Sequence, residues 1–187
     1  MISPQFISFQ NNFPASEVLC IFSTRNGGLS SGKYHSLNLG LKTGDSRQSV
    51  IANREKLFSS INILESQIAF TDQVHSTEVK FVTAPGIYEK TDALITNRPN
   101  LYLAIQAADC FPVFIYYPRQ RIIAAIHAGW RGALNGIIAK TISNMCDLFK
   151  VKPGNLLTAI GPGLQKECFE VQKDVFSLFD GKYLTET

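Results

Sequence analysis

Short apolar runs alternate with segments of helical spacing along this chain. The runs are rich in Ile, Val, Leu, Phe and Tyr and are bounded by turn-forming residues, a pattern typical of buried strands. They predict strands at 18–23, 67–70, 78–83, 92–96, 101–107, 111–117, 121–127 and 156–160. A segment rich in Gly, Ser and Asn, at 24–34, predicts a loop instead.

Apolar residues at helical spacing follow Asp45 and Ser46, which are good helix starters, and predict a helix over 46–61. Arg54 lies on the apolar stripe of this helix. An arginine in that place either extends its charged end into water along an apolar stem or reaches into a polar pocket. The pattern leaves both interpretations open.

A longer helical pattern at 133–150 ends before Pro153, and 174–179 begins a final helix. Strands and helices are mixed without strict alternation. No linker, repeat or low-complexity tract divides the chain. We therefore expect one domain over residues 1–187, of the α+β or mixed α/β class.

Composition and charge exclude several classes of protein. The 187 residues are 45% hydrophobic and 18% charged, as in ordinary globular domains. A net charge of +3 without a Lys/Arg block does not suit a nucleic-acid partner. No apolar stretch approaches the roughly 20 residues of a membrane span, and the first residues do not read as a secretion signal. We expect a cytoplasmic protein with no membrane partner and with reduced cysteines.

Three residues that could bind a metal stand at the ends of apolar runs: His75, Cys110 and His127. Strand ends bring together side chains from distant parts of a sequence. Two imidazoles and one thiolate suit zinc, and three protein ligands leave a fourth position open, as in catalytic rather than structural zinc sites. Such long separations are not a zinc signature by themselves. Hydrogen-bonded core histidines beside a buried cysteine therefore stay an alternative.

Without a metal, Cys110 and His127 could act as a nucleophile and its base, a dyad in which His75 has no evident place. Backbone N–H groups in the glycine-rich segment 129–132 could hold an anion such as phosphate, although a tight turn explains these glycines better. Asn38, which stands between two leucines, must be hydrogen-bonded if it is buried.

Three aspartates lie near the candidate site or near strand ends: Asp72, Asp92 and Asp109. Asp92 and Asp109 are candidates for a general acid. We expect Asp109 to point away from the side of its neighbour Cys110 if the backbone there is extended.

Five segments together resemble a known family. They are TRNGGLS at 24–30, SLNLG at 36–40 with Gly44-Asp45, DQVHS at 72–76, AADCFPV at 107–113 and HAGWRG at 127–132, supported by DALIT at 92–96 and AIGP at 159–162. The sequence is similar to the multicopper polyphenol oxidoreductase (laccase-like) family, also described as the peptidoglycan editing factor or purine nucleoside phosphorylase family. The A-D-C-x-P-V and H-A-G-W-R-G motifs, in this order and close together, are the most specific.

The resemblance implies zinc on His75, Cys110 and His127, with Asn38 and Arg54 lining a nucleoside pocket. It also implies phosphorolysis of purine nucleosides with phosphate, and deamination of adenosine. The implied fold is a mixed α/β sandwich, with mixed sheets in the centre and helices outside. The family name suggests copper, which we discount because a multicopper centre needs more than the three histidines present.

Two features depart from the family pattern. Asp72 stands where the family commonly has His or another polar residue. The family chain also continues past the position of Thr187, so the domain looks shortened at its C-terminus.

The leading hypothesis is a zinc-dependent purine nucleoside phosphorylase and adenosine deaminase. Arg54, together with the backbone near Gly129, would hold phosphate, and Asn38 would orient the nucleoside. One alternative is a cysteine hydrolase or amidase that edits peptidoglycan precursors with Cys110 and His127. Another is a non-catalytic binding protein that zinc stabilises.

Overall fold

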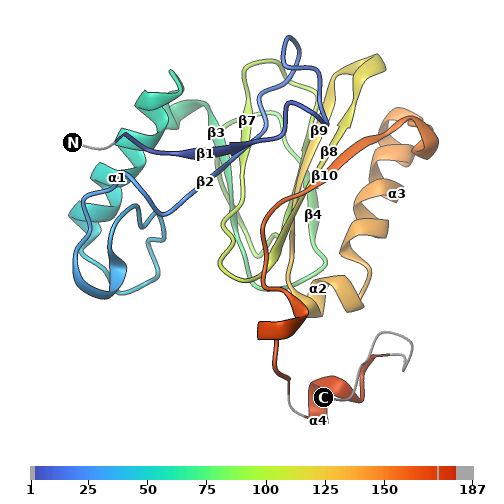
Figure 1. The fold of residues 1–187 in the computed structure, drawn as a ribbon. Helices are drawn as coiled ribbons and strands as arrows, with labels where there is room; N and C mark the ends of the chain where they lie inside the picture. Colours follow the sequence, from blue (N-terminus) through green and yellow to red (C-terminus); the bar gives the residue numbers. More distant parts are fainter. Residues whose placement is uncertain (1–2, 172, 180–187) are drawn as a thin grey trace.

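The computed structural model describes residues 3–171 and 173–179 of the chain. Its strands form a five-stranded, a three-stranded and a two-stranded sheet, and the longer helices lie outside them (Figure 1). The expected α+β sandwich of mixed sheets with outer helices is confirmed.

The five-stranded sheet carries most of the predicted apolar runs. Its strand order is β10 (Leu157–Ile160), β8 (Phe111–Tyr117), β9 (Ile122–Ala128), β6 (Ala93–Thr96) and β4 (Val79–Phe81). Neighbours among the first four strands pair antiparallel, whereas β4 runs parallel to β6. The hairpin of β8 and β9 brings the start of one strand beside the end of the other, and Pro112 lies opposite His127.

One face of this sheet packs against helix α3 (Ile137–Phe149). Alternate residues of β9 point to that side, and Ile122, Ala124, Ile126 and Ala128 join Ile137 and Met145 of the helix in one buried cluster. Fully burying an aliphatic side chain contributes about 1.5–3 kcal/mol, so this cluster anchors the sheet. The intervening residues of β9, including His127, must then face the opposite side.

The opposite face looks toward the three-stranded sheet. That sheet has the order β5 (Gly86–Glu89), β3 (Ile68–Asp72) and β7 (Tyr102–Ala104), with all pairs parallel. Ala69, Val82, Leu94 and Leu101 form the buried contact between the sheets. The space near this contact is where β9 directs His127.

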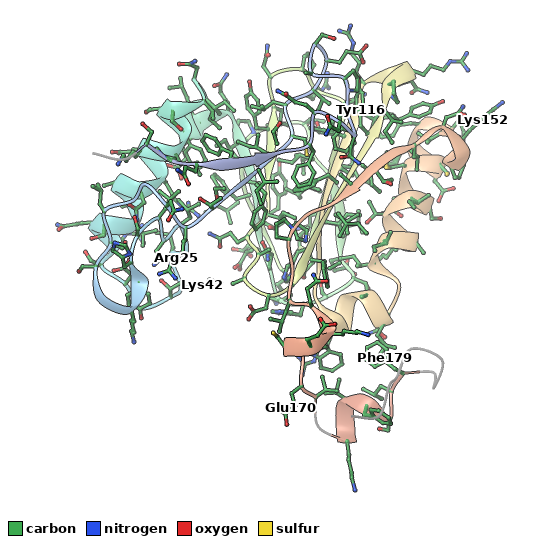
Figure 2. All side chains as sticks on the ribbon, in the orientation of Figure 1. Arg25, Lys42, Tyr116, Lys152, Glu170 and Phe179 are labelled. Atoms are coloured by element: carbon green, nitrogen blue, oxygen red, sulfur yellow. The ribbon has the colours of Figure 1, made fainter. Side chains whose placement is uncertain are left out.

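Helix α1 (Arg47–Ser60) covers the other side of the molecule from α3 (Figure 1). Ser46 caps it, since its side chain accepts a hydrogen bond from the Ser49 amide, as the sequence predicts. Inward-facing Asn53 is fully buried and holds the preceding loop by bonding the Leu29 amide and the Asn38 carbonyl. Figure 2 shows Arg25 and Lys42 on the loops that precede α1 in the chain, near the lower end of that side of the molecule.

The two-stranded sheet joins β1 (Phe6–Ser8) to β2 (Ile21–Ser23). Phe9 and Phe13, which follow β1, pack with Tyr116 of β8 and Ala159 of β10. The N-terminal segment therefore covers part of the face of the large sheet that looks away from α3.

The expected helix over 133–150 is wrong in its bounds. The structure has α2 (Trp130–Leu134) and then α3, separated at Asn135 and Gly136. Gly136 has φ +80°, a left-handed conformation that ends one helix and starts the next, and glycine adopts it without steric cost.

Several strands are shorter than expected, and two were not predicted. The apolar run 101–107 yields only Tyr102–Ala104, and 18–23 yields only Ile21–Ser23. Strands β1 and β5 lack a buried apolar run, so no periodicity marks them. The final helix begins as α4 (Lys173–Phe176), close to the expected 174–179. Among the described residues, no helix has the length and apolarity to cross a membrane.

Candidate metal centre

His75, Cys110 and His127 converge at one edge of the sheets. Their candidate ligand atoms all lie within 4.8 Å of one another. Cys110 Sγ is 3.8 Å from His75 Nε2, and the two imidazole rings meet edge to face with centroids 4.9 Å apart. The predicted grouping of these residues is therefore present.

Each of the three comes from a different part of the fold. His127 lies in β9 and is only 4% exposed. Cys110 directly precedes β8, and His75 lies in the loop after β3 and is exposed. His75 has φ +59°, a left-handed conformation that is uncommon for a residue with a Cβ. Local contacts must hold it there.

Asp92 supplies those contacts. This aspartate is fully buried, and its Oδ1 accepts hydrogen bonds from the His75 amide at 3.0 Å and from His127 Nδ1 at 2.8 Å. Its Oδ2 accepts from the amides of Val74 and Ser76 and from the Ser76 hydroxyl. Burial opposes ionisation, but hydrogen bonds from His127, Ser76 and Val74 outweigh it and lower the pKa of Asp92. The carboxylate is therefore charged at neutral pH.

His127 and Cys110 are both uncharged at neutral pH in this environment. Burial lowers the pKa of His127, with the neighbouring His75 acting in the same direction and Asp92 opposing it. Burial also raises the pKa of the Cys110 thiol, and the negative charges of Asp109 and Asp92 add to the effect. A metal cation would reverse the balance for Cys110, because it stabilises the thiolate.

Gly129 leaves room for the three side chains. A Cβ at this position would lie 2.7 Å from His75 Cδ2 and 3.1 Å from Cys110 Sγ. Its backbone has φ −69°, so close approach to the site, rather than a special conformation, requires glycine here. The tight-turn interpretation of the 129–132 segment does not apply to this glycine.

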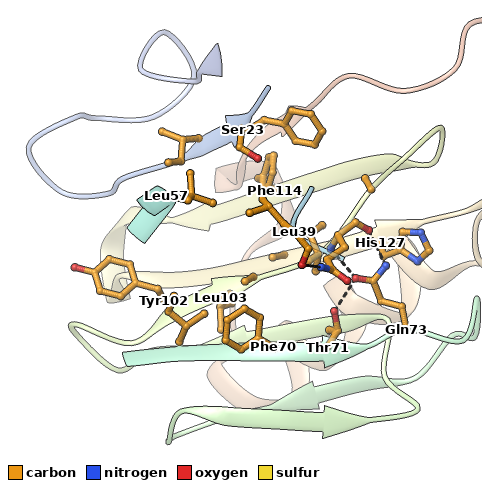
Figure 3. Close-up of a pocket in the computed structure, with 18 of the residues that line it drawn as sticks. Ser23, Leu39, Leu57, Phe70, Thr71, Gln73, Tyr102, Leu103, Phe114 and His127 are labelled. Carbon is orange, nitrogen blue, oxygen red and sulfur yellow. Dashed lines mark hydrogen bonds between the residues drawn. The ribbon is translucent and has the colours of Figure 1, made fainter. Parts of the chain in front are cut away.

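The three residues open into a cavity of about 1030 Å³ between the sheets. Figure 3 shows His127 and Gln73 toward one end and Tyr102 and Leu57 toward the other. Its walls are mostly apolar, with Leu57, Phe70, Leu103 and Phe114 among them. Ligand pockets are typically about 300–1,000 Å³, so a nucleoside-sized molecule fits.

Gln73 connects the strand end before His75 to the chain that leads to Cys110. Its amide group donates to the Gln106 carbonyl and accepts from the Gln106 amide, both at 2.7 Å. Thr71 donates to the same Gln73 oxygen (Figure 3). This pairing fixes the spacing between the His75 and Cys110 segments, a role that residue type alone does not indicate.

Asn38 and Arg54 both line the cavity. The Asn38 side chain is held by Thr43, Asp45 and the Gly40 amide, so it shapes its own loop. Arg54 is buried, so of its two interpretations the one in which the side chain reaches into a pocket holds, and not the one in which it extends into water. Its Nε donates to the Leu39 carbonyl.

The guanidinium of Arg54 also has a charged and an aromatic neighbour. Its Nη1 lies 3.1 Å from Glu65 Oε1, and its Cζ lies 4.8 Å from the centre of the Phe70 ring. Arginine has five N–H donors, so the bonds to Leu39 and Glu65 leave capacity for a further anion.

The three aspartates that the sequence singles out lie in different settings. Asp109 has φ +79°, so the backbone there is not extended and the expectation that it points away from Cys110, which required an extended backbone, does not apply. Its exposed position and its carbonyl bond from the Leu164 amide fit a turn residue. Asp72 forms an ion pair with Lys42. Asp92 is fully buried, and its carboxylate accepts hydrogen bonds from five donors.

Sequence comparisons agree with the motifs. A family model described as multi-copper polyphenol oxidoreductase laccase matches residues 19–186. A protein named purine nucleoside phosphorylase from Deinococcus radiodurans is 38% identical over 165 residues, which cover 88% of this chain and 64% of that protein. Purine nucleoside phosphorylase YfiH of Escherichia coli is 38% identical, and the match covers 84% of this chain and 63% of that protein. The chain thus spans about 64% of the length of such relatives.

Solved structures share the fold. The crystal structure of the Bacillus licheniformis hypothetical protein YfiH has a TM-score of 0.85 and 32% identity, covering 94% of this chain and 68% of that one. The crystal structure of YlmD from Geobacillus stearothermophilus also has a TM-score of 0.85, with 28% identity, and covers 88% of this chain and 65% of that one. With the family model matching most of its length, the chain belongs to the multi-copper polyphenol oxidoreductase laccase family.

Proposed function

We propose that this chain is a zinc-dependent purine nucleoside enzyme, which cleaves purine nucleosides with phosphate and deaminates adenosine. The observation that carries the proposal is the convergence of His75, Cys110 and His127 at the edge of the cavity. Relatives named purine nucleoside phosphorylase support the substrate class.

The donor set fits zinc. Two imidazole nitrogens and one thiol sulfur are borderline-soft ligands, and three protein ligands leave a position open for a reacting group. Gly129 keeps the space beside them free of a side chain. A bound zinc ion would supply Lewis-acid polarisation of the reacting atom. Copper of the multicopper type remains discounted, because the chain has only three histidines.

The chain's own residues would bind and orient the substrates. The apolar walls, including Phe70 and Leu103, suit a purine base and exclude water from it. Arg54 would hold phosphate with the N–H donors that Leu39 and Glu65 do not use. Asn38 would orient the nucleoside with the remaining acceptor capacity of its side-chain oxygen.

The cysteine hydrolase alternative uses the same Cys110 and His127, which lie close enough for it. Its weakness is the raised pKa of Cys110, since the thiolate is the nucleophile. The binding-protein alternative is kept as an outcome of the test.

The test is an assay of purified protein with adenosine and inosine, with and without inorganic phosphate. Liquid chromatography would separate free base, ribose phosphate and deaminated nucleoside. We expect phosphate-dependent release of the base, loss of activity in His75→Ala, and retention in His35→Ala, a histidine outside the site. Metal-free amidase activity that alkylation of Cys110 destroys would favour the hydrolase. Bound zinc without turnover of either nucleoside would favour the binding protein.

A further inference from the structure

A single buried carboxylate touches both histidine-bearing segments of the candidate metal centre. Asp92 directly precedes β6, His127 lies in β9, and His75 lies in the loop after β3. The Asp92 backbone also takes part, because its carbonyl accepts from the His127 amide at 2.8 Å. One residue thus fixes His127 through both its main chain and its side chain.

The hydrogen-bond partners of the Asp92 carboxylate determine which ring nitrogen of His127 carries the proton. The backbone amides of Val74, His75 and Ser76 can only donate, and all three converge on the two oxygens of Asp92. The carboxylate must therefore accept, and His127 Nδ1 must carry the proton that it donates. His127 Nε2 then carries a lone pair, which is the form of imidazole that binds a metal.

The same contacts hold the His75 loop. Consecutive amides of residues 74–76, with positive φ at His75, form a concave cluster of N–H groups that favours an anion. The Asp92 carboxylate is that anion. Without it the amides lose their acceptor, and the left-handed conformation of His75 loses its support.

We infer that Asp92 is the positioning residue of the metal centre: it holds His127 with Nε2 available for the metal and simultaneously holds the loop that carries His75. The inference rests on the proposed zinc site. It adds that metal affinity depends on a carboxylate that is not itself a ligand. Partners of this kind that orient a ligating histidine typically change metal affinity by about 10–100-fold.

An amide cannot replace this carboxylate. If the side-chain NH₂ of Asp92→Asn took the Oδ2 place, it would face the amides of Val74 and Ser76, which also donate. If it took the Oδ1 place, it would face the His75 amide and would force His127 Nδ1 to accept. The proton of His127 would then move to Nε2, the ligand atom.

The test combines two readouts on the full chain. ¹⁵N NMR of the metal-free wild type at neutral pH reports which His127 nitrogen carries the proton. We expect Nδ1–H, and an Nε2–H tautomer would overturn the inference without any variant being needed. Zinc affinity, measured by competition with a chromophoric chelator, should fall by about 10–100-fold in Asp92→Asn.

Asp45→Asn is the matched control. Asp45 accepts from Ser30, Asn38 and the Ser46 amide, and none of these partners is one of the three candidate ligands. We expect Asp45→Asn to keep wild-type zinc affinity and the His127 tautomer. Wild-type zinc affinity in a folded Asp92→Asn variant would contradict the inference.

Failure of the proposed function gives a different result. Wild type that binds no zinc would refute the metal centre and with it the role of Asp92 toward the metal. Wild type that binds zinc but turns over no nucleoside would refute the activity and leave the positioning role supported. If Asp92→Asn does not fold, Ser76→Ala removes one of the five donors, and we expect a smaller loss of zinc affinity.

Discussion

Gly129 and His75 lie so close together that a Cβ on the glycine would be 2.7 Å from Cδ2 of the imidazole. The two residues are 54 positions apart in the sequence, yet they share one space. The same added carbon would be 3.1 Å from Cys110 Sγ. Any side chain at 129 must therefore displace candidate metal ligands.

Gly129→Ala should weaken metal binding. Overpacking a tight site costs about 1–3 kcal/mol, and 1.4 kcal/mol corresponds to tenfold, so we expect zinc affinity to fall by roughly ten- to a hundredfold. Gly154→Ala is the control, since a Cβ there would meet nothing within 4 Å. Chelator competition would measure both. Equal affinities for the two variants and wild type would show that Gly129 does not border the metal.

The metal-free protein should lose stability as the pH falls below 6.5. Burial lowers the pKa of His127 from 6.5 in the folded state, so the unfolded chain takes up this proton first. Well above pH 6.5 His127 is neutral in both states and its contribution to stability is fully present; the contribution is lost as the pH falls through 6.5 toward the lower folded pKa. Urea unfolding between pH 5 and 8, about the range in which histidine titrates, would detect this slope. If a His127→Gln variant showed the same dependence of unfolding free energy on pH, a group other than His127 would be responsible for it.

Cys110 should react slowly with iodoacetamide at neutral pH once metal is removed. Its pKa is raised above 9.0 by burial and by Asp109 and Asp92, so the reactive thiolate is scarce until the pH exceeds 9. Peptide mass spectrometry would follow the reaction, with exposed Cys168 as the reference thiol in the same sample. Fast alkylation of Cys110 at pH 7, well beyond that of Cys168, would instead indicate an activated nucleophile.

Arg54→Lys should impair phosphate use without removing zinc. Lysine lacks the planar fork that bonds the Leu39 carbonyl and Glu65 and lies against Phe70. We expect the KM for phosphate to rise by about tenfold, the effect of losing one charge-assisted hydrogen bond, with zinc content unchanged. The exposed Arg119→Lys serves as the control. An unchanged phosphate KM would remove Arg54 from the proposed phosphate site.

Continuous apolar runs made much of the fold predictable. The strand Phe111–Tyr117 has the predicted bounds because turn residues flank a run that is buried on both faces. The strand Gly86–Glu89 was not predicted, since its residues are mostly exposed and carry no such run. The helix break at Gly136 was also missed, because a single glycine inside an apolar pattern does not show whether the chain turns left-handed there.

The candidate ligands were predictable for a similar reason. His75, Cys110 and His127 each follow or close an apolar run, and strand ends meet at sheet edges. The role of Asp92 was not predictable, because it depends on backbone amides at 74–76 that only the packed fold brings to its carboxylate. Gln73 likewise acts through the backbone of Gln106, which no residue pattern reveals.

The most direct measurement is the metal content of the purified protein by elemental mass spectrometry, for wild type and Cys110→Ala together. We predict about one zinc per chain in wild type, as expected for a single site with three protein ligands, and its loss in the variant. Wild type free of zinc, or a variant that keeps it, would contradict a zinc centre on His75, Cys110 and His127.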